Sequence, residues 1–285
     1  MGEIHTVGVV GAGTMGSGIA HVFARAGFRV LLCDIDQRYL DRALNQIRTN
    51  LGREAAKGRL PEGEIETVLG RITPTTDRDS LSAAQFAVEA ASERFELKSE
   101  IFRALDRILP TNTILATNTS SISITRLAGL TRRPQDVIGM HFFNPVPVMA
   151  LVEVIRGLAT SDATFTAVRD LAIRLGKTAV EVNDAPGFVS NRVLMPLINE
   201  AAYSVMEGVA TAESIDQVFK LGMAHPMGPL TLADFIGLDV CVDIMRVLHE
   251  GHGNPKYSPC PLLVRMVDAG WLGRKSGRGF YSYEK

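Results

Sequence analysis

Two residues that together can transfer a proton, His141 and Glu153, stand at the ends of a stiff apolar connection. Residues 136–142 and 151–155 have the apolar character of buried strands, and a proline on either side of Val146 excludes a helix between them. Strands joined by such a corner can bring the imidazole and the carboxylate face to face. A histidine oriented by a carboxylate acts as a general acid or base. A structural histidine inside the protein and an exposed strand glutamate are the alternative interpretation.

A glycine-rich turn follows the first expected strand, residues 4–10. Gly11, Gly13 and Gly16 come next, and apolar residues at helical spacing continue to Gly27. In a strand, turn and helix of this kind, the first glycine permits the tight turn and the second lets the backbone approach a pyrophosphate. The third lets the helix pack closely, and the helix N-terminus supplies free N–H groups. The sequence therefore predicts a dinucleotide site.

An acidic residue supports this prediction. Asp34 ends the second expected strand, residues 28–34, and lies 18 residues after Gly16, near the spacing of about 20 that is typical of a ribose-binding carboxylate. Its charge repels a 2′-phosphate, which favours NAD over NADP. Arg38 nearby keeps NADP open as the less favoured alternative.

Polar residues also follow two later strands. Glu93 and Lys98 come after the strand expected at residues 86–90, and Asn118 and Ser120 come after residues 114–117. In an open parallel sheet, residues just beyond the carboxyl ends of strands line the ligand crevice. We therefore expect these side chains at the same edge as the glycine turn. Ser120 has an alternative task, because its hydroxyl can cap the short helix that follows.

The chain is expected to form two domains. Residues 1–186 carry further strands at 71–74 and 178–182 and a helix at 162–175, which predicts an α/β Rossmann-type domain with a mostly parallel sheet. A helical insertion is expected near residues 36–70. Residues 187–285 have helical periodicity and no strand character, which predicts an all-α domain for the substrate cleft and for oligomerisation.

Two further positions are candidates for substrate binding. Asn191 interrupts an apolar helical face, so it is either an exposed or capping amide or a donor that enters a cleft between domains. Arg53 and Lys57 are the better basic candidates for binding phosphates in the helical insertion. A solvated helix face is the alternative for these two residues.

Composition excludes several classes of protein. The formal charge of −1 across 285 residues gives no global field for nucleic acid or anionic membrane. No run of 18 apolar residues exists, and the first strand leaves no room for a leader peptide. The three cysteines are widely spaced and show no metal-ligand pattern, which indicates reduced thiols and no metal site. We expect a cytoplasmic protein.

These motifs, taken together and in order, resemble the 3-hydroxyacyl-CoA dehydrogenase family. The resemblance runs from about residue 7 to residue 283. It is carried by Gly11-Ala-Gly13-Thr-Met-Gly16, Ala116-Thr-Asn118-Thr-Ser120-Ser, Gly139-Met-His141-Phe-Phe-Asn144-Pro145, Leu151-Val-Glu153-Val-Ile, Asp184-Ala-Pro-Gly-Phe-Val-Ser-Asn191-Arg, His225-Pro-Met-Gly-Pro and Gly273-Arg-Lys-Ser-Gly-Arg-Gly-Phe-Tyr281.

The resemblance implies a reaction and roles for these residues. The expected enzyme interconverts a short (3S)-3-hydroxyacyl-CoA, such as 3-hydroxybutyryl-CoA, with its 3-ketoacyl-CoA, a β-oxidation type of step in fatty acid metabolism. His141 is implied as the general base and Glu153 as its orienting partner, while Ser120 and Asn191 bind the reacting oxygens. Coenzyme A phosphates are implied near Lys57, and homodimers through the helical domain. The residues implied as NAD contacts are Asp34, Glu93, Lys98, Asn118 and Asn144.

Other functions keep the same fold. The substrate can be another hydroxyacyl-CoA, such as 3-hydroxyadipyl-CoA, or a hydroxy acid. A catalytically silent relative that only binds NAD is a third hypothesis. The intact set of Ser120, His141, Glu153 and Asn191 argues against it.

Overall fold

The computed structural model describes residues 3–283 and divides the chain into two compact units. The first unit is Met1–Asp184 and the second is Ala185–Lys285. The division falls two residues before the limit expected at residue 186.

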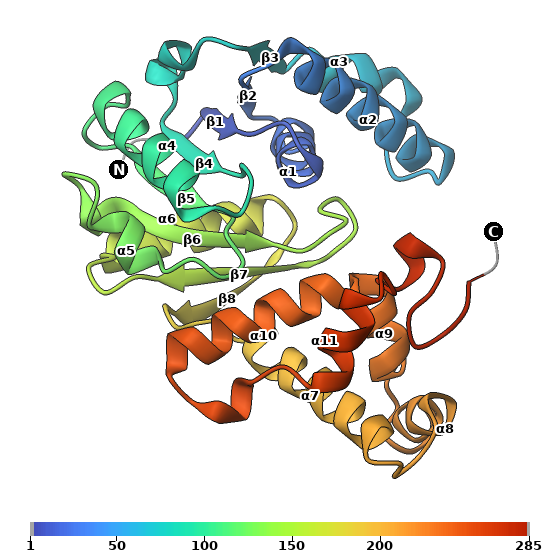
Figure 1. The fold of residues 1–285 in the computed structure, drawn as a ribbon. Helices are drawn as coiled ribbons and strands as arrows, with labels where there is room; N and C mark the ends of the chain where they lie inside the picture. Colours follow the sequence, from blue (N-terminus) through green and yellow to red (C-terminus); the bar gives the residue numbers. More distant parts are fainter. Residues whose placement is uncertain (1–2, 284–285) are drawn as a thin grey trace. The chain divides into compact units, whose positions relative to one another are not determined.

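The first unit is built on an eight-stranded sheet in the order β3-β2-β1-β4-β5-β6-β7-β8 (Figure 1). Neighbouring strands run parallel except β6 and β7, which are antiparallel. All eight strands coincide with segments predicted from apolar runs, and the predicted Rossmann-type fold is confirmed. The strands are β1 Thr6–Val10, β2 Arg29–Cys33, β3 Ile72–Thr75, β4 Phe86–Glu89, β5 Ile114–Thr117, β6 Val137–Phe142, β7 Leu151–Arg156 and β8 Thr178–Asn183.

Helices connect the strands and cover the sheet. One face carries the main apolar core, to which Ile19 and Phe23 of α1, Leu40 of α2 and Leu171 of α6 contribute. The short helix α5 packs on β6 and β7. The helices are α1 Thr14–Arg25, α2 Gln37–Ala56, α3 Ile65–Leu69, α4 Phe95–Ile108, α5 Ile124–Ala128 and α6 Asp162–Arg174.

The second unit is helical, as predicted. Its largest core cluster joins Met195 and Ile198 of α7 to Leu238 and Met245 of α10 and to Leu263 of α11. None of the helices within residues 3–283 is long and apolar enough to cross a membrane. The elements are α7 Ser190–Met206, α8 Ala212–Gln217, the π-helical segment η4 Val218–Gly222, α9 Pro229–Ile236, α10 Leu238–His252 and α11 Pro261–Asp268.

The helical region expected from residue 187 onward is interrupted at two places. The chain leaves the helix after Gly222, and α9 begins only at Pro229. A second break falls at Gly237, where φ is +108°. Glycine adopts this conformation without the steric cost that a Cβ would bring.

Two buried aspartates explain the motifs His225-Pro-Met-Gly-Pro and Gly273–Tyr281 of this unit. Asp216 accepts a hydrogen bond from the Tyr281 hydroxyl at 2.8 Å, and a Cβ at Gly228 would lie 2.3 Å from its Cγ. Asp234 accepts a hydrogen bond from the Tyr281 N–H at 3.0 Å, and a Cβ at Gly279 would lie 1.9 Å from its Oδ1. These glycines allow backbone to pack on the carboxylates, so both motifs hold the C-terminal segment in place.

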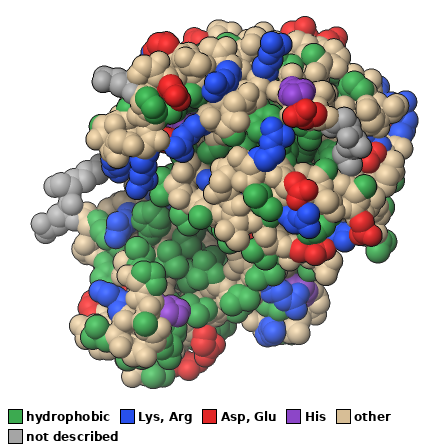
Figure 2. Space-filling view, turned by 180° about the vertical axis from the view of Figure 1, so that it is seen from behind, with side chains coloured by type: hydrophobic (Ala, Val, Ile, Leu, Met, Phe, Trp, Pro, Cys, Tyr) green, Lys and Arg blue, Asp and Glu red, His purple; other side chains and the backbone are tan. Residues whose placement is uncertain are grey.

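Several large apolar side chains of the second unit are exposed, and hydrophobic side chains gather over this unit in Figure 2. Val189, the N-cap residue of α7, and Val193 within this helix belong to this exposed set. Large patches of exposed apolar side chains are uncommon on monomers. The set comprises Val189, Val193, Val209, Val218, Leu221, Met223, Phe235 and Val240.

Candidate active site

The sheet brings His141 and Glu153 together, as the sequence predicted. They are directly opposite each other in the antiparallel pair of β6 and β7. Nδ1 of His141 lies 2.8 Å from Oε2 of Glu153, and the two residues are 8% and 3% exposed. Since side chains alternate along a strand, Met140 and Phe142 point into the core while His141 points to the opposite face. The catalytic role of the pair stays a prediction.

The connection between these strands is held from two sides. Val146 packs against α1, where a Cβ at Gly18 would lie 2.8 Å from its Cβ. The Lys177 ammonium donates to the carbonyls of Val146 and Met149 at 2.6 and 2.7 Å. Burial, with Arg25 nearby, lowers the pKa of Lys177. The expected rigid corner is therefore fixed by contacts as well as by its prolines.

The glycine turn has the geometry that dinucleotide binding requires. Gly11 has a φ of +103°, and a Cβ there would lie 2.7 Å from the Ala90 carbonyl oxygen. A Cβ at Gly16 would lie 1.8 Å from the Gly11 carbonyl oxygen. Apart from its chain neighbours, no described residue has a heavy atom within 4 Å of a Cβ built at Gly13. The protein itself needs the first and third glycines, and the second leaves open space in which a phosphate fits.

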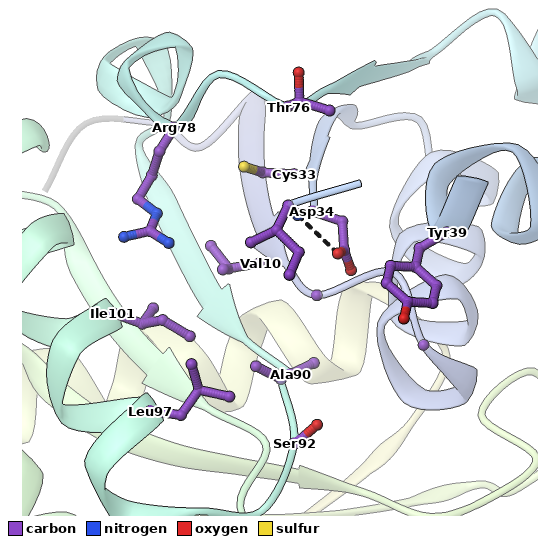
Figure 3. A pocket seen from close by; sticks show the side chains of 14 residues that line it. Val10, Cys33, Asp34, Tyr39, Thr76, Arg78, Ala90, Ser92, Leu97 and Ile101 are labelled. Carbon is purple, nitrogen blue, oxygen red and sulfur yellow. Dashed lines mark hydrogen bonds between the residues drawn. The ribbon is translucent and has the colours of Figure 1, made fainter. Parts of the chain in front are cut away.

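A cavity of about 390 Å³ lies at the carboxyl ends of β1, β2 and β4 (Figure 3). Asp34 lines it and accepts hydrogen bonds from the N–H groups of Ala12 and Ile35 at 2.6 and 2.7 Å. Arg38, the reason for keeping NADP as the less favoured cofactor, pairs with Asp36. It does not line the cavity. Open backbone at Gly13 and a carboxylate at the end of β2 fit the adenosine half of NAD.

Sequence reasoning missed other residues that line this cavity. They come from the start of α2, the start of a 3₁₀-helix that follows β3, and α4, and no spacing rule connects them to the glycine motif. Apolar residues recurring along α4 were the only signal, and these read equally well as core. The missed residues include Tyr39, Arg78, Leu97 and Ile101.

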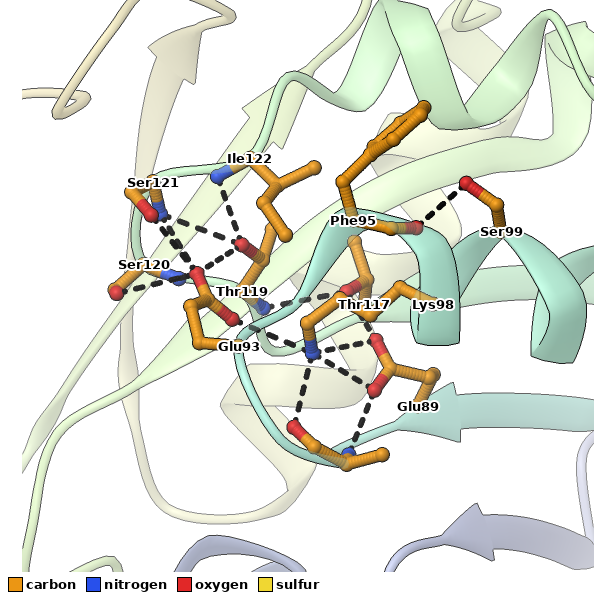
Figure 4. A network of polar contacts seen from close by, with 11 residues as sticks. Glu89, Glu93, Phe95, Lys98, Ser99, Thr117, Thr119, Ser120, Ser121 and Ile122 are labelled. Atoms are coloured by element: carbon orange, nitrogen blue, oxygen red, sulfur yellow. Dashed lines mark hydrogen bonds and ion pairs between the residues drawn. The ribbon is translucent and has the colours of Figure 1, made fainter. Parts of the chain in front are cut away.

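Glu93, Lys98 and Ser120 meet at the ends of β4 and β5, as predicted (Figure 4). Glu93 accepts hydrogen bonds from the backbone N–H groups of Ser120 and Ser121 at 2.9 and 3.1 Å and from the Thr119 hydroxyl. Burial alone would raise the pKa of Glu93, but Lys98 and these hydrogen bonds hold it below its ordinary value. Glu93 is therefore an anion that orders the turn carrying Ser120.

Asn118 connects two strands beside His141. Its side-chain Oδ1 accepts a hydrogen bond from the Phe142 N–H at 2.9 Å. The backbone N–H of Asn118 donates to the Glu89 carbonyl at 2.7 Å. This side chain therefore fixes the end of β5 to the end of β6. The predicted contact of Asn118 with NAD stays a prediction.

The remaining candidates come from other segments of the chain. Asn144, also predicted to contact NAD, is exposed just after β6. Arg53 and Lys57 are exposed at the end of α2, where they remain candidates for phosphate binding. Asn191 is partly buried in the first turn of α7, in the second unit.

Comparison with known proteins identifies the family of both units. The family model described as 3-hydroxyacyl-CoA dehydrogenase, NAD binding domain, matches residues 6–185. The model of the C-terminal domain of 3-hydroxyacyl-CoA dehydrogenase matches residues 187–283. The two matches together cover nearly the whole chain, as the resemblance of the motifs predicted.

Individual relatives agree with these matches. A probable 3-hydroxybutyryl-CoA dehydrogenase of Bacillus subtilis is 58% identical over 283 residues, which cover 99% of each chain. The crystal structure of (S)-3-hydroxybutyryl-CoA dehydrogenase from Ralstonia eutropha has a TM-score of 0.97 and 50% identity, covering 99% of this chain and 100% of that one. A 3-hydroxyadipyl-CoA dehydrogenase of Escherichia coli is 42% identical over 99% of this chain and 59% of its own length. The chain therefore belongs to the 3-hydroxyacyl-CoA dehydrogenase family of NAD-dependent oxidoreductases.

Proposed function

We propose that the protein interconverts (3S)-3-hydroxybutyryl-CoA and acetoacetyl-CoA with NAD(H). The observation that carries this proposal is the hydrogen-bonded pair of His141 and Glu153. The strands that carry this pair belong to the same sheet as the strands that precede the glycine turn and the Asp34 cavity. The names of the relatives from Bacillus subtilis and Ralstonia eutropha support the choice of substrate.

The chain's own residues divide the work in this proposal. His141 takes the proton of the substrate hydroxyl during oxidation and returns it during reduction. Glu153, 2.8 Å from Nδ1, orients the ring and stabilises the imidazolium, so the proton is exchanged at Nε2. Ser120 and Asn191 bind the reacting oxygens and fix the orientation of the substrate. Bound NAD supplies or accepts the hydride.

The cofactor and coenzyme A have separate binding residues in this proposal. Gly11, Gly13 and Gly16 receive the pyrophosphate, and Asp34 binds the adenosine ribose. Glu93, Lys98, Asn118 and Asn144 serve the nicotinamide half. Arg53 and Lys57, both exposed on α2, bind phosphates of coenzyme A.

Purified protein with acetoacetyl-CoA and NADH tests the substrate. We expect loss of the reduced-nicotinamide absorbance, faster with NADH than with NADPH because Asp34 repels a 2′-phosphate. A series of 3-ketoacyl-CoA substrates of increasing chain length should show the highest kcat/KM for the four-carbon acyl chain. Failure to oxidise NADH with any of these thioesters would contradict the proposal.

A dicarboxylic acyl chain is the second candidate. The relative from Escherichia coli, named as acting on 3-hydroxyadipyl-CoA, favours it. The same assay with 3-oxoadipyl-CoA separates the two candidates. A higher kcat/KM for this substrate than for acetoacetyl-CoA would replace the four-carbon assignment.

We also propose that the enzyme is a homodimer that works in the cytoplasm. The exposed apolar side chains of the second unit support the dimer, because burial in an interface would remove them from water. Three free, buried cysteines suit a reducing compartment.

We expect light scattering to give twice the mass of one chain. Replacing Leu221, which is 83% exposed, with glutamate should shift the protein toward the monomer if Leu221 lies in the interface.

A further inference from the structure

A buried ion pair lies next to the turn that carries Ser120 (Figure 4). Glu89, the last residue of β4, is 0% exposed, and Lys98 of α4 is 1% exposed. The Lys98 ammonium donates to the two carboxylate oxygens of Glu89 at 2.7 and 2.9 Å. Glu89 also accepts hydrogen bonds from the Thr117 hydroxyl at 2.7 Å and from the Ala91 N–H at 2.6 Å. One carboxylate thus joins β4, β5 and α4.

Lys98 connects this carboxylate to a second one. Its ammonium lies 3.4 Å from Oε2 of Glu93. The other oxygen of Glu93, Oε1, accepts hydrogen bonds from the Ser120 N–H at 2.9 Å and from the Ser121 N–H and hydroxyl at 3.1 and 3.0 Å. The order of contacts is therefore Glu89, Lys98, Glu93 and the serine turn.

Stability alone is a poor explanation for this arrangement. A buried ion pair generally contributes no more to folding than a well-packed apolar pair, because both charges lose their hydration. What the network does fix is position. Glu89 holds the Lys98 ammonium at short distance, and this limits how closely the ammonium can approach Glu93. Without the Glu89 charge, Lys98 would move toward Glu93 and draw that carboxylate away from the serine turn.

We propose that Glu89 is a positioning residue, which acts through Lys98 and Glu93 to place Ser120 for the substrate oxygen. This rests on the proposed function, because it requires Ser120 to bind the substrate. Sequence reasoning assigned Lys98 a contact with NAD. Its hydrogen bonds to Glu89 and to the Ala91 carbonyl give it a positioning task in addition to that contact.

Replacing Glu89 with glutamine tests the proposal, since the side chain keeps its shape and loses its charge. We expect kcat for acetoacetyl-CoA reduction to fall about 10- to 100-fold, as displacement of an orienting group by about 1 Å can produce. Thr117→Val is a second variant that leaves both charges in place and removes one hydrogen bond to Glu89. We expect it to lower kcat in the same direction by a smaller factor.

A double-mutant cycle shows whether Glu89 acts through Ser120. In a Ser120→Ala background, Glu89→Gln should lower kcat by a much smaller factor than in the wild type, because the group that it positions is already absent. Thermal unfolding of each variant establishes that the kcat values compare folded proteins.

Asp106→Asn provides a matched control on the same helix. Asp106 lies at the other end of α4 and pairs with Arg133 at 2.9 Å, and both residues are 4% exposed. This variant should lose stability and keep the kcat of the folded enzyme.

The proposal is overturned if folded Glu89→Gln retains wild-type kcat, if its effect is undiminished in the Ser120→Ala background, or if Asp106→Asn lowers kcat equally. A wild-type protein that does not reduce acetoacetyl-CoA would overturn the proposed function, and this proposal with it.

Discussion

His141→Ala is expected to lower kcat for acetoacetyl-CoA reduction by about 10²–10⁴-fold, the usual contribution of a positioned general acid or base. During reduction, the oxygen at C3 gains negative charge and must receive a proton. The imidazolium of His141, held against Glu153 at 2.8 Å, is the group that we assign to supply it. Steady-state kinetics with saturating NADH measure the effect.

A histidine elsewhere in the same unit gives the control. His5 precedes β1, at the end of the sheet away from the glycine turn, and its side chain is 64% exposed. His5→Ala should therefore keep wild-type kcat. NADH affinity should be unchanged in both variants, since neither residue lines the Asp34 cavity. Near-normal turnover by His141→Ala would remove the proposed acid and base from the reaction.

The strands of the first unit could be predicted because most of them are buried on both faces. Such strands are nearly continuous apolar runs, and the segments that became β1, β4 and β5 end in glycine or polar residues. The pairing of His141 with Glu153 followed from two such runs and a short rigid connection. Local sequence was sufficient because the two residues are only 12 positions apart.

The supports of the site could not be predicted in this way. Lys177 reaches Val146 from 31 positions away, and Thr117 reaches Glu89 from 28 positions away. A lysine before a strand and a glutamate ending one usually indicate solvated residues. Their burial depends on tertiary contacts that no spacing rule contains, so the ion pair of Glu89 and Lys98 appeared only in the structure.

Local sequence could not predict the buried charges of the second unit either. Asp216 and Asp234 lie in short helices and are 4% and 0% exposed. Burial raises the pKa of Asp234, and nearby Asp216 adds to this, although hydrogen bonds from residues 280, 281 and 283 oppose the shift. An aspartate in a helical segment predicts a solvated face. The glycines that pack on these carboxylates were visible as motifs, but their purpose was not.

Replacing Glu153 with glutamine is expected to lower kcat by a factor of the same order, about 10²–10⁴, with NADH affinity retained. Glutamine preserves the shape of a side chain that is 3% exposed. It removes the charge that stabilises the imidazolium, and its amide can face Nδ1 of His141 with a donor in place of an acceptor. Both effects act on the proton transfer, so kcat should fall while the KM for NADH stays nearly constant.

Glu181→Gln separates this charge effect from a general effect on the sheet. Glu181 is on the adjacent strand β8, where it is paired in register with Val154 and binds the exposed end of Arg156 at 3.2 Å. The same substitution there removes a surface ion pair of little energetic value, so kcat should be unchanged. If Glu153→Gln, shown by thermal unfolding to be folded, kept the wild-type kcat, His141 would act without a carboxylate partner. If both variants lost activity equally, the loss would reflect damage to the sheet, because of these two glutamates it is Glu153 that is hydrogen-bonded to the imidazole.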